Sequence, residues 1–323
     1  MDEFALIERH FRRAPRDPAV RVGIGDDGAV ISPTPDADLV LSVDMLVEGR
    51  HFFAGADAAR LGHKALAVNL SDLAAMGATP RFALLAGALP DADEAWLAAF
   101  MAGFRALADE FGVELIGGDT TRGPRNLCVT VVGEVPRGAA LTRSGARDGD
   151  DIYVSGNLGD AALALAVIER RTTLDAAALS LARERLERPC PRVALGLRLR
   201  AVASAALDIS DGLAGDLRHV LERSQVGAIV DLAAVPCSAA LAAKCSGPER
   251  ALALACLLAG GDDYELCFCA PPAARAQIAA CAAALALPLT RIGAITAGGG
   301  LVVRDEHGTP LPALPRAFDH FAA

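Results

Sequence analysis

The sequence predicts a two-domain protein of mixed helices and strands, and three observations support this fold class. The 323 residues are enough for two domains, each with its own core. Strand-like apolar runs alternate with helical patterns along the chain, which is typical of α/β proteins. A polar joint at residues 141–149 interrupts this alternation. We therefore expect domains at 1–139 and 140–323.

In the first half, Phe4, Ile7 and Phe11 recur at helical spacing, which predicts a helix over 3–13. Short runs rich in β-branched residues predict strands, and longer amphipathic stretches predict helices. On these patterns the expected strands are 20–22, 29–31, 39–43, 84–89, 113–116 and 127–135, and the further helices are 58–78 and 91–111.

In the second half the same patterns predict another alternating set of elements. The expected strands are 151–155, 266–269, 292–295 and 301–304, and the expected helices are 160–170, 175–187, 192–206 and 272–286. A further helix is expected to begin near Gly212, directly after an aspartate-rich turn.

The charge and the apolar runs exclude several classes of partner. A formal net charge of −9 argues against nucleic acid as the main partner, although magnesium can reverse the sign locally and allow nucleotides to bind. No uncharged apolar run reaches the length of a membrane span, so no membrane partner is expected. The first residues carry no basic segment leading into an apolar one. We expect a cytoplasmic protein.

The eight cysteines form no C-x-x-C pair, and most of them lie in apolar runs. We therefore expect buried, reduced thiols. Cys267 and Cys269 are two apart in a strand-like run and should point to one face. A metal or redox role for this pair is the less favoured interpretation.

Five aspartate-containing clusters lie at glycine turns or at the ends of apolar runs. They are Gly25-Asp26-Asp27-Gly28, Ser42-Val43-Asp44, Asn69-Leu70-Ser71-Asp72, Gly117-Gly118-Asp119-Thr120-Thr121 and Asp208-Ile209-Ser210-Asp211-Gly212. Carboxylates gathered without lysines repel one another and need cations. Hard oxygen ligands without nearby His or Cys suit magnesium rather than zinc. The pattern indicates a magnesium-dependent phosphoryl-transfer site.

The first cluster also has an alternative interpretation, because residues 23–28 match the dinucleotide fingerprint G-x-G-x-x-G. That fingerprint requires a helix immediately afterwards. Here the strand-like run 29–31 follows, and two aspartates in the loop would repel a pyrophosphate. A metal-bearing turn is the better interpretation. The phosphate-binding pattern G-x-x-x-x-G-K-[ST] does not occur in the chain.

Two further clusters have structural alternatives. Asp44 should follow the end of strand 39–43, where ligands of α/β sheets gather. Asn69 and Asp72 should share one face of a largely apolar helix, where they are costly to bury unless something satisfies them. The alternative is that Ser71 and Asp72 cap a new helical turn.

Asp208 could merely cap the helix that begins near Gly212, but one aspartate suffices for a cap. Asp208 and Asp211 flanking a serine at a helix start favour an anion or metal site. His51, taken alone, is better interpreted as a satisfied imidazole than as a ligand.

These motifs together resemble the thiamine-monophosphate kinase family, of the superfamily shared with aminoimidazole ribonucleotide synthetase and selenide, water dikinase. The matching stretches are GIGDDGAVI (23–31), SVDMLVEGRHF (42–52), KALAVNLSDLAAMGA (64–78), GGDTTRGP (117–124), ALTRSGARDGDDIYVSG (140–156), ALDISDGLAGDL (206–217), GGDDYELCF (260–268) and AFDHF (317–321). The resemblance implies transfer of the γ-phosphoryl group of ATP to thiamine monophosphate, which gives thiamine diphosphate.

The resemblance also implies roles for individual residues. The implied ligands of several magnesium ions are Asp27, Ser42, Val43 (through its carbonyl), Asp44, Asp72, Asp119, Asp208 and Asp211. The implied ATP-binding residues are Gly118, Asp119, Arg143 and Ser210, and the implied substrate-binding residues are His51, Asp262 and Phe318. Two positions depart from the family: Asp262 replaces the usual Glu, one methylene shorter, and Val43 replaces a common Thr.

The fold that the resemblance implies is an N-terminal α/β domain followed by a C-terminal α+β domain. In such proteins the N-terminal domains of a homodimer pair through a β-barrel-like interface. The acceptor would be a phosphate, which is largely dianionic at neutral pH because its second pKa is about 6. It needs no general base, so the absence of a catalytic acid–base pair from the motifs is expected.

Two other functions are weighed against this one. A selenide-using member of the superfamily should carry a reactive Cys near its N-terminus, whereas the first cysteine here is Cys128, and a hydrogenase-maturation member should end with a Cys, whereas this sequence ends in Ala. A non-catalytic magnesium–nucleotide binding module would be expected to lose some of the aspartates, and all are present.

Overall fold

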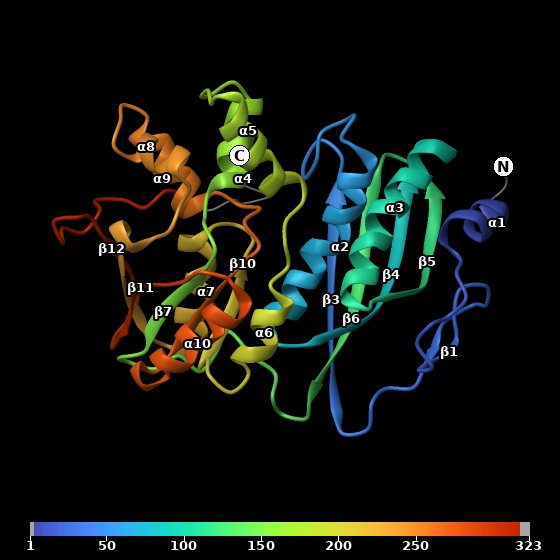
Figure 1. Cartoon of the computed structure of the whole chain (residues 1–323), viewed down its shortest axis with the longest axis horizontal. Coiled ribbons are helices and arrows are strands. Elements are labelled where there is room, and N and C mark those ends of the chain that lie inside the picture. The colour runs from blue at the N-terminus through green and yellow to red at the C-terminus, as the bar shows by residue number, and fades with distance from the viewer. Residues whose placement is uncertain (1–2, 317–323) are drawn as a thin grey trace. The chain divides into compact units, whose positions relative to one another are not determined.

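The computed structural model describes residues 3–316, which form two compact units (Figure 1). The first unit comprises the described residues up to Leu73 together with Ala78–Ala140. The second comprises Ala74–Gly77 and the described residues from Leu141 onward. Among the residues described, none of the helices has both the length and the hydropathy that crossing a membrane requires.

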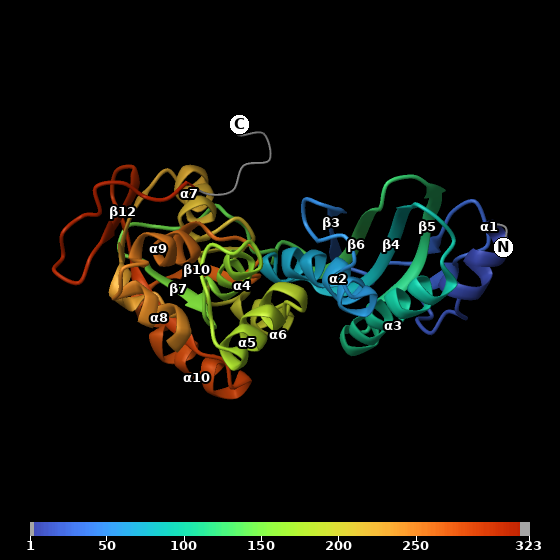
Figure 2. The ribbon, with the colours of Figure 1, turned by 90° about the horizontal axis from the view of Figure 1, so that it is seen from above.

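The first unit is built on a four-stranded sheet in the order β3-β6-β4-β5. Its strands are β3 (Ala37–Val47), β4 (Thr79–Leu89), β5 (Glu114–Arg122) and β6 (Asn126–Pro136). β4 and β5 are parallel, whereas β6 pairs antiparallel with both β3 and β4. The helices α2 (Ala58–Ala75) and α3 (Glu94–Phe111) lie along one face of this sheet (Figure 2).

The two helices approach one another closely enough to require glycine. A Cβ on Gly62 of α2 would lie 1.9 Å from the carbonyl oxygen of Phe100, and one on Gly103 of α3 would lie 1.8 Å from that of Ala59. Any side chain at either position would push the helices apart. This packing fixes α2, the helix that carries Asn69 and Asp72, against α3.

The N-terminal segment packs on both sides of the sheet: its strands lie over the face opposite the helices, whereas the carbonyl of His10 accepts a hydrogen bond from Arg105 of α3. It contains α1 (Glu3–Leu6), a π-helical turn η1 (Ile7–Phe11), and the paired strands β1 (Val20–Val22) and β2 (Val30–Ile31). Val20 of β1 packs with Phe82, Ile116 and Val132 of the sheet. β3 lies at the sheet's edge, and its outward side chains stay exposed.

Arg81 of β4 ties the N-terminal segment to the sheet. Its Nη2 donates to Asp17 Oδ2 at 2.8 Å, and its Nη1 donates to the buried carboxylate of Glu134. The same carboxylate accepts the backbone N–H of Thr34 at 2.9 Å. Burial acts against ionisation of Glu134, but the bonds from Thr34 and the charge of Arg81 prevail and lower its pKa.

The second unit contains a six-stranded sheet in the order β12-β9-β11-β7-β10-β8. Its strands are β7 (Asp151–Ser155), β8 (Ala205–Ile209), β9 (Gly227–Asp231), β10 (Glu265–Ala270), β11 (Leu289–Thr296) and β12 (Gly300–Arg304). Its helices are α4 (Asp160–Ile168), α5 (Ala176–Glu187), α6 (Val193–Leu199), α7 (Leu213–Ser224), α8 (Ala239–Cys245), α9 (Arg250–Ala259) and α10 (Arg275–Leu285), with short 3₁₀ turns η2 (Leu232–Ala234) and η3 (Pro272–Ala274).

The core of this unit lies between the sheet and the helices α4, α7, α8 and α9. Ile152, Val154, Leu207 and Ile209 supply its sheet side, with Cys267 and Cys269 beside them. All eight cysteines belong to the described part of the chain and are free thiols. Burial raises the pKa of Cys267 to about 12, so the chemistry of this pair is that of inert core thiols.

Several elements differ from those predicted. The expected helix over 192–206 is wrong at its end, because α6 stops at Leu199 and residues 205–209 form strand β8. The alanine-rich run favours a helix locally, but pairing with β10 along five residues overrides that preference. The sequence patterns also gave no prediction for β9, α8 or α9.

We expect Arg81→Met to destabilise the first unit by roughly 2–3 kcal/mol at pH 7, because it leaves the buried Glu134 charge without its cation. A carboxylate with a lowered folded-state pKa contributes stability above its unfolded pKa, 4.5 here, and loses it as the pH falls through the folded value. The difference between variant and parent should therefore shrink below about pH 4.

Chemical denaturation between pH 7 and pH 3 measures this difference. Arg137→Met is the matched control, since Arg137 forms an exposed ion pair with Asp36 and should change stability little. A deficit for Arg81→Met that stays constant over the whole pH range would contradict the assigned role.

Candidate functional site

In the first unit, strand β3 and helix α2 are joined through predicted site residues. The hydroxyl of Ser42 donates to Asp72 Oδ2 at 2.5 Å. The backbone N–H of Asp44 donates to Asn69 Oδ1 at 2.9 Å, and Asn69 is fully buried. The structure thus brings together hydroxyl and carboxylate oxygens from the second and third aspartate clusters. The capping alternative for Asp72 is excluded, because α2 continues to Ala75.

Two of the predicted aspartates lie inside strands, whereas the sequence patterns predicted them at strand ends. Asp44 is in the middle of β3, opposite Val129 of β6, since the strand continues to Val47. Asp119 lies within β5, opposite Ala86 of β4. Pairing along the sheet extends both strands beyond the apolar runs that suggested their ends.

Gly118 and Asp119 border a small apolar pocket. The pocket is lined by Ile7, Phe11, Ile24, Leu85, Leu115, Gly117, Gly118, Asp119 and Thr120. Asp27 lies in the exposed turn after β1, where its own N–H donates to Asp26 Oδ1 at 2.9 Å.

His51 lies in the turn that follows β3, and its ring is held by the backbone of that turn. The N–H of Val47 donates to His51 Nδ1 at 3.0 Å, and the N–H of His51 donates to the carbonyl of Val47. An acceptor at Nδ1 places the proton of the neutral imidazole on Nε2. The ring is thus oriented to present Nε2 as a donor.

In the second unit, the loop after β8 is organised around a single carboxylate. Asp216 Oδ2 accepts the consecutive backbone N–H groups of Ser210, Asp211 and Gly212 at 3.1, 3.0 and 3.0 Å. Burial raises the pKa of Asp216 to about 6, although the three N–H bonds act in the opposite direction. The capping alternative for Asp208 is excluded, because Asp208 lies within β8 and is buried.

The loop before β10 lies directly against this loop. The N–H of Asp262 donates to the carbonyl of Ser210 at 2.9 Å, and that of Tyr264 donates to the carbonyl of Ile209 at 2.8 Å. Asp262 and Tyr264 have left-handed φ values of 68° and 48°. Such values are uncommon outside glycine and often mark functional loops. The structure therefore brings Asp262 together with Ser210 and its neighbours.

Two carboxylates hold the loop before β10 and the start of that strand from the other side. Asp263 accepts the N–H of Gly159, at the start of α4, at 2.9 Å, and burial raises the pKa of Asp263 well above its usual value. Glu265 accepts a hydrogen bond from the hydroxyl of Ser155 at 2.5 Å. It also accepts hydrogen bonds from Nε and Nη2 of Arg192. Such a two-point contact is the strong form of the Arg–carboxylate pair.

Arg143 lies at a different place in the second unit from Ser210. The carbonyl of the adjacent Thr142 accepts the N–H of Ala206, near the start of β8, whereas Ser210 follows the end of that strand. Four residues of strand separate the two points, or roughly 13 Å. Phe318, the other predicted substrate contact, lies outside the described residues.

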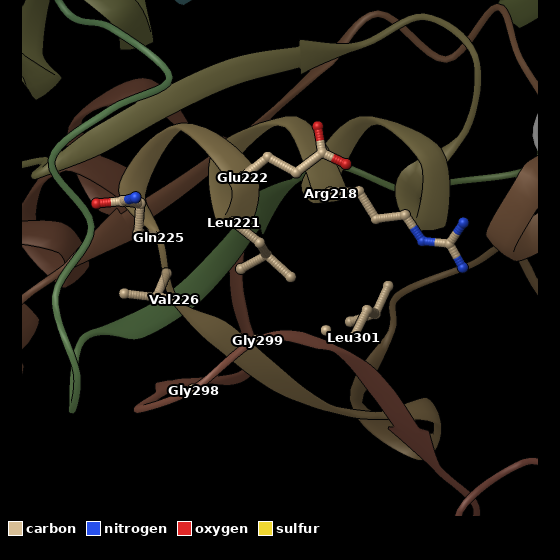
Figure 3. Close-up of a pocket in the computed structure, with 9 residues that line it drawn as sticks. Arg218, Leu221, Glu222, Gln225, Val226, Gly298, Gly299 and Leu301 are labelled. Carbon is tan, nitrogen blue, oxygen red and sulfur yellow. The ribbon is translucent and has the colours of Figure 1, made fainter.

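A separate cavity of about 450 Å³ lies between α7 and the turn joining β11 to β12 (Figure 3). Its lining includes Arg218 and Glu222 of α7 and the glycine run 298–300. None of the predicted site residues that the structure describes lines it. Among residues 3–316, no three His, Cys, Asp or Glu side chains are grouped so that they could hold a metal ion.

Three anchoring residues were missed by sequence reasoning: Asp216, Asp263 and Glu265. Each occurs in a stretch noted for its aspartates, but nothing in the local pattern distinguishes a ligand from a carboxylate that accepts backbone N–H groups. The one signal in the sequence is the position of Asp216, in the first turn of the helix expected to begin near Gly212.

Comparison with known proteins identifies both halves of the chain. Residues 25–135 match the model of the AIR synthase related protein, N-terminal domain, and residues 147–306 match that of its C-terminal domain. The thiamine-monophosphate kinase of Escherichia coli K12 is 46% identical over 99% of this chain and 98% of its own length. That of Haemophilus influenzae is 39% identical over the same shares.

Solved structures give the same result. The crystal structure of thiamine-monophosphate kinase from Stenotrophomonas maltophilia is 49% identical, with a TM-score of 0.87 over 96% of this chain and 98% of that one. AaThiL, solved in complex with AMPPCP and TMP, is 30% identical, with a TM-score of 0.77 over 92% of each chain. The hydrogenase maturation protein HypE, at 23% identity and a TM-score of 0.76, shares the fold.

Proposed function

Because the chain belongs to the thiamine-monophosphate kinase family, we infer that it transfers the γ-phosphoryl group of ATP to thiamine monophosphate, giving thiamine diphosphate and ADP. The observation that carries this inference is 46% identity over the full length of an enzyme with that name. The related AaThiL, solved with an ATP analogue and TMP together, supports direct transfer between the two.

The reaction forms a bond from a phosphate oxygen of thiamine monophosphate to the γ-phosphorus and breaks the bond from that phosphorus to ADP. The acceptor phosphate is mostly deprotonated at neutral pH, so the chain needs to supply no general base. Two unit charges 4 Å apart repel by about 4 kcal/mol at an effective dielectric of 20. The task of the protein is therefore to hold two anions together in line.

We propose that magnesium ions are held by Asp27, Ser42, Asp44, Asp72, Asp119, Asp208 and Asp211 and by the carbonyl of Val43. The hydroxyl of Ser42 already lies beside Asp72, and such hard oxygen donors are the ligands that magnesium prefers. When bound, magnesium would neutralise the phosphate charges and align them for transfer. The side chain of Val43 is a hydrocarbon without donor atoms, so only its backbone carbonyl could serve as a ligand.

The chain's own residues would position the two substrates. We propose that Gly118, Asp119, Arg143 and Ser210 bind ATP, and that His51, Asp262 and Phe318 bind thiamine monophosphate. The orientation of His51 supports a donor role, since Nδ1 is occupied by the Val47 N–H. The backbone hydrogen bond between Asp262 and Ser210 supports this assignment, because it would hold a residue that binds thiamine monophosphate beside one that binds ATP.

We expect the protein to release ADP from ATP and magnesium only when thiamine monophosphate is present, as measured by a coupled ADP assay.

Asp44→Asn and Asp72→Asn should each abolish turnover, because each removes a ligand charge while keeping the side chain's size. Asp38→Asn, on the same strand, is the matched control and should stay active. Full activity of either site variant with magnesium would refute the metal assignment.

We expect His51→Ala to raise the KM for thiamine monophosphate about tenfold while changing the KM for ATP little, because one donor to the acceptor is lost. Steady-state kinetics with each substrate varied in turn measure the split. His63→Ala, a change of the same kind in helix α2, should leave both constants unchanged. An equal loss for both substrates would remove His51 from the acceptor site.

We propose that the protein is a homodimer paired through the outer face of β3. Leu39, Leu41, Val43 and Met45 point outward there and are between 43% and 63% exposed. Together they form an apolar stripe on an edge strand, which soluble proteins usually cover. A second copy would bury this stripe and continue the sheet toward a barrel.

We expect Leu41→Glu to weaken self-association at least tenfold, because it would place a charge in the apolar interface. Sedimentation velocity over a concentration series measures the change. Leu181→Glu, at a position of α5 that is 74% exposed, serves as the control for an added surface charge. A Leu41→Glu protein that dimerises like its parent would argue against this face.

A further inference from the structure

Asp216 links the two loops of the second unit that carry predicted substrate contacts. It stands in the first turn of α7, is 6% exposed, and accepts three consecutive backbone N–H groups through one oxygen, Oδ2. Hydrogen bonds to a charged acceptor are stronger than neutral ones, and three of them aimed at one point leave the loop little freedom.

The backbone of residues 209–212 is fixed from a second direction. Gly212 has a φ of 112°, and a Cβ on it would lie 2.6 Å from the Cα of Ala259. The loop is thus pressed against the end of α9, and no side chain could be accommodated between them. With this contact on one side and Asp216 on the other, the peptide groups of 210–212 have a single orientation.

The same peptide groups also bind the loop of residues 260–264, which precedes β10 and is called the acceptor loop below. Ser210 donates its N–H to Asp216 and accepts the N–H of Asp262 at its carbonyl, so one residue joins the anchor to a predicted substrate contact. The neighbouring carbonyl of Ile209 accepts the N–H of Tyr264. Displacing the loop of Ser210 would therefore also displace Asp262.

We propose that Asp216 is a positioning residue that sets, through the peptide groups of Ser210, both the ATP–metal loop 208–212 and the acceptor loop 260–264. The roles of the two loops in binding ATP and thiamine monophosphate rest on the proposed function. The hydrogen bonds that connect the loops through Ser210 do not depend on it. Asp216 Oδ2 already accepts three N–H groups, which makes it an anchor for the loop rather than a ligand of the substrates.

The test compares Asp216→Ala, which removes the acceptor, with Asp216→Asn, which keeps an acceptor oxygen but not its charge. Hydrogen–deuterium exchange, measured by mass spectrometry over 206–217 and 259–266, reports on the two loops without needing activity. Steady-state kinetics report the KM for ATP, the KM for thiamine monophosphate and the half-saturating magnesium concentration.

We expect Asp216→Ala to accelerate exchange in both segments by roughly tenfold or more, and to raise all three kinetic constants by a similar factor. Asp216→Asn should lie between this variant and the parent. The control is Asp150→Asn, since Asp150 is a buried carboxylate that accepts the N–H of Arg147 and the hydroxyl of Ser204 in another part of the unit. It should leave both loops and all three constants unchanged.

Faster exchange in 206–217 alone, with 259–266 unchanged, would overturn the link between the loops. A lower kcat with unchanged KM values and unchanged exchange would reduce Asp216 to a purely structural role and would likewise overturn the proposal. If Asp216→Ala does not fold, the comparison of Asp216→Asn with Asp150→Asn decides. If the parent shows no ADP release, the proposed function fails, while exchange in 259–266 still decides whether Asp216 couples the loops.

Discussion

The candidate site of the second unit depends on backbone hydrogen bonds between two loops rather than on contacts between side chains. The carbonyls of Ile209 and Ser210 receive the N–H groups of Tyr264 and Asp262. Because main-chain groups make these bonds, the loop geometry tolerates changes in the side chains that face the substrates. The side chain at position 262 can then differ without altering the loop that presents it.

Several carboxylates in this unit accept hydrogen bonds from the protein itself, either from backbone N–H groups or from Ser and Arg side chains. Asp216 organises the loop after β8, and Asp263 binds the N–H of Gly159 at the start of α4. The number of acidic residues in the chain therefore overstates the number of carboxylates that are available to bind cations. An acidic sequence segment contains both anchors and ligands, and the hydrogen bonds of the folded chain separate the two roles.

Much of the fold and the family could be predicted from the sequence, and the comparisons confirm both. The aspartate clusters pointed to phosphoryl transfer, in agreement with the kinase family, because residue type and glycine spacing are local properties. Strand ends are not local: Asp44 and Asp119 lie inside β3 and β5 because pairing with β6 and β4 extends those strands. Strand β8 was missed because an alanine-rich run gives no sign of the partner β10.

The anchoring roles of Asp216 and Glu265 could not be predicted for a related reason. Glu265 depends on Ser155 and Arg192, which return from elsewhere in the sequence, whereas the partners of Asp216 are nearby in the chain but reach it only through the turn that the folded loop adopts. The residue type determines which interactions a side chain can form. The fold determines which partner it meets, and therefore which of these interactions it forms. The residue assignments for magnesium and substrates stay predictions for the experiments described.

Strand β3 presents two different rows of alternate residues. Ser42 and Asp44 belong to one row, and Leu41, Val43 and Met45 belong to the other. The strand pairs with β6 without a bulge over its whole length, from Ala37 to Val47. A single-residue insertion or deletion here would exchange the two rows, turning polar groups outward and apolar ones inward. A one-residue change in the length of this strand would therefore disturb both of its proposed roles, metal binding and dimer contact, whereas substitutions can alter one row and leave the other intact.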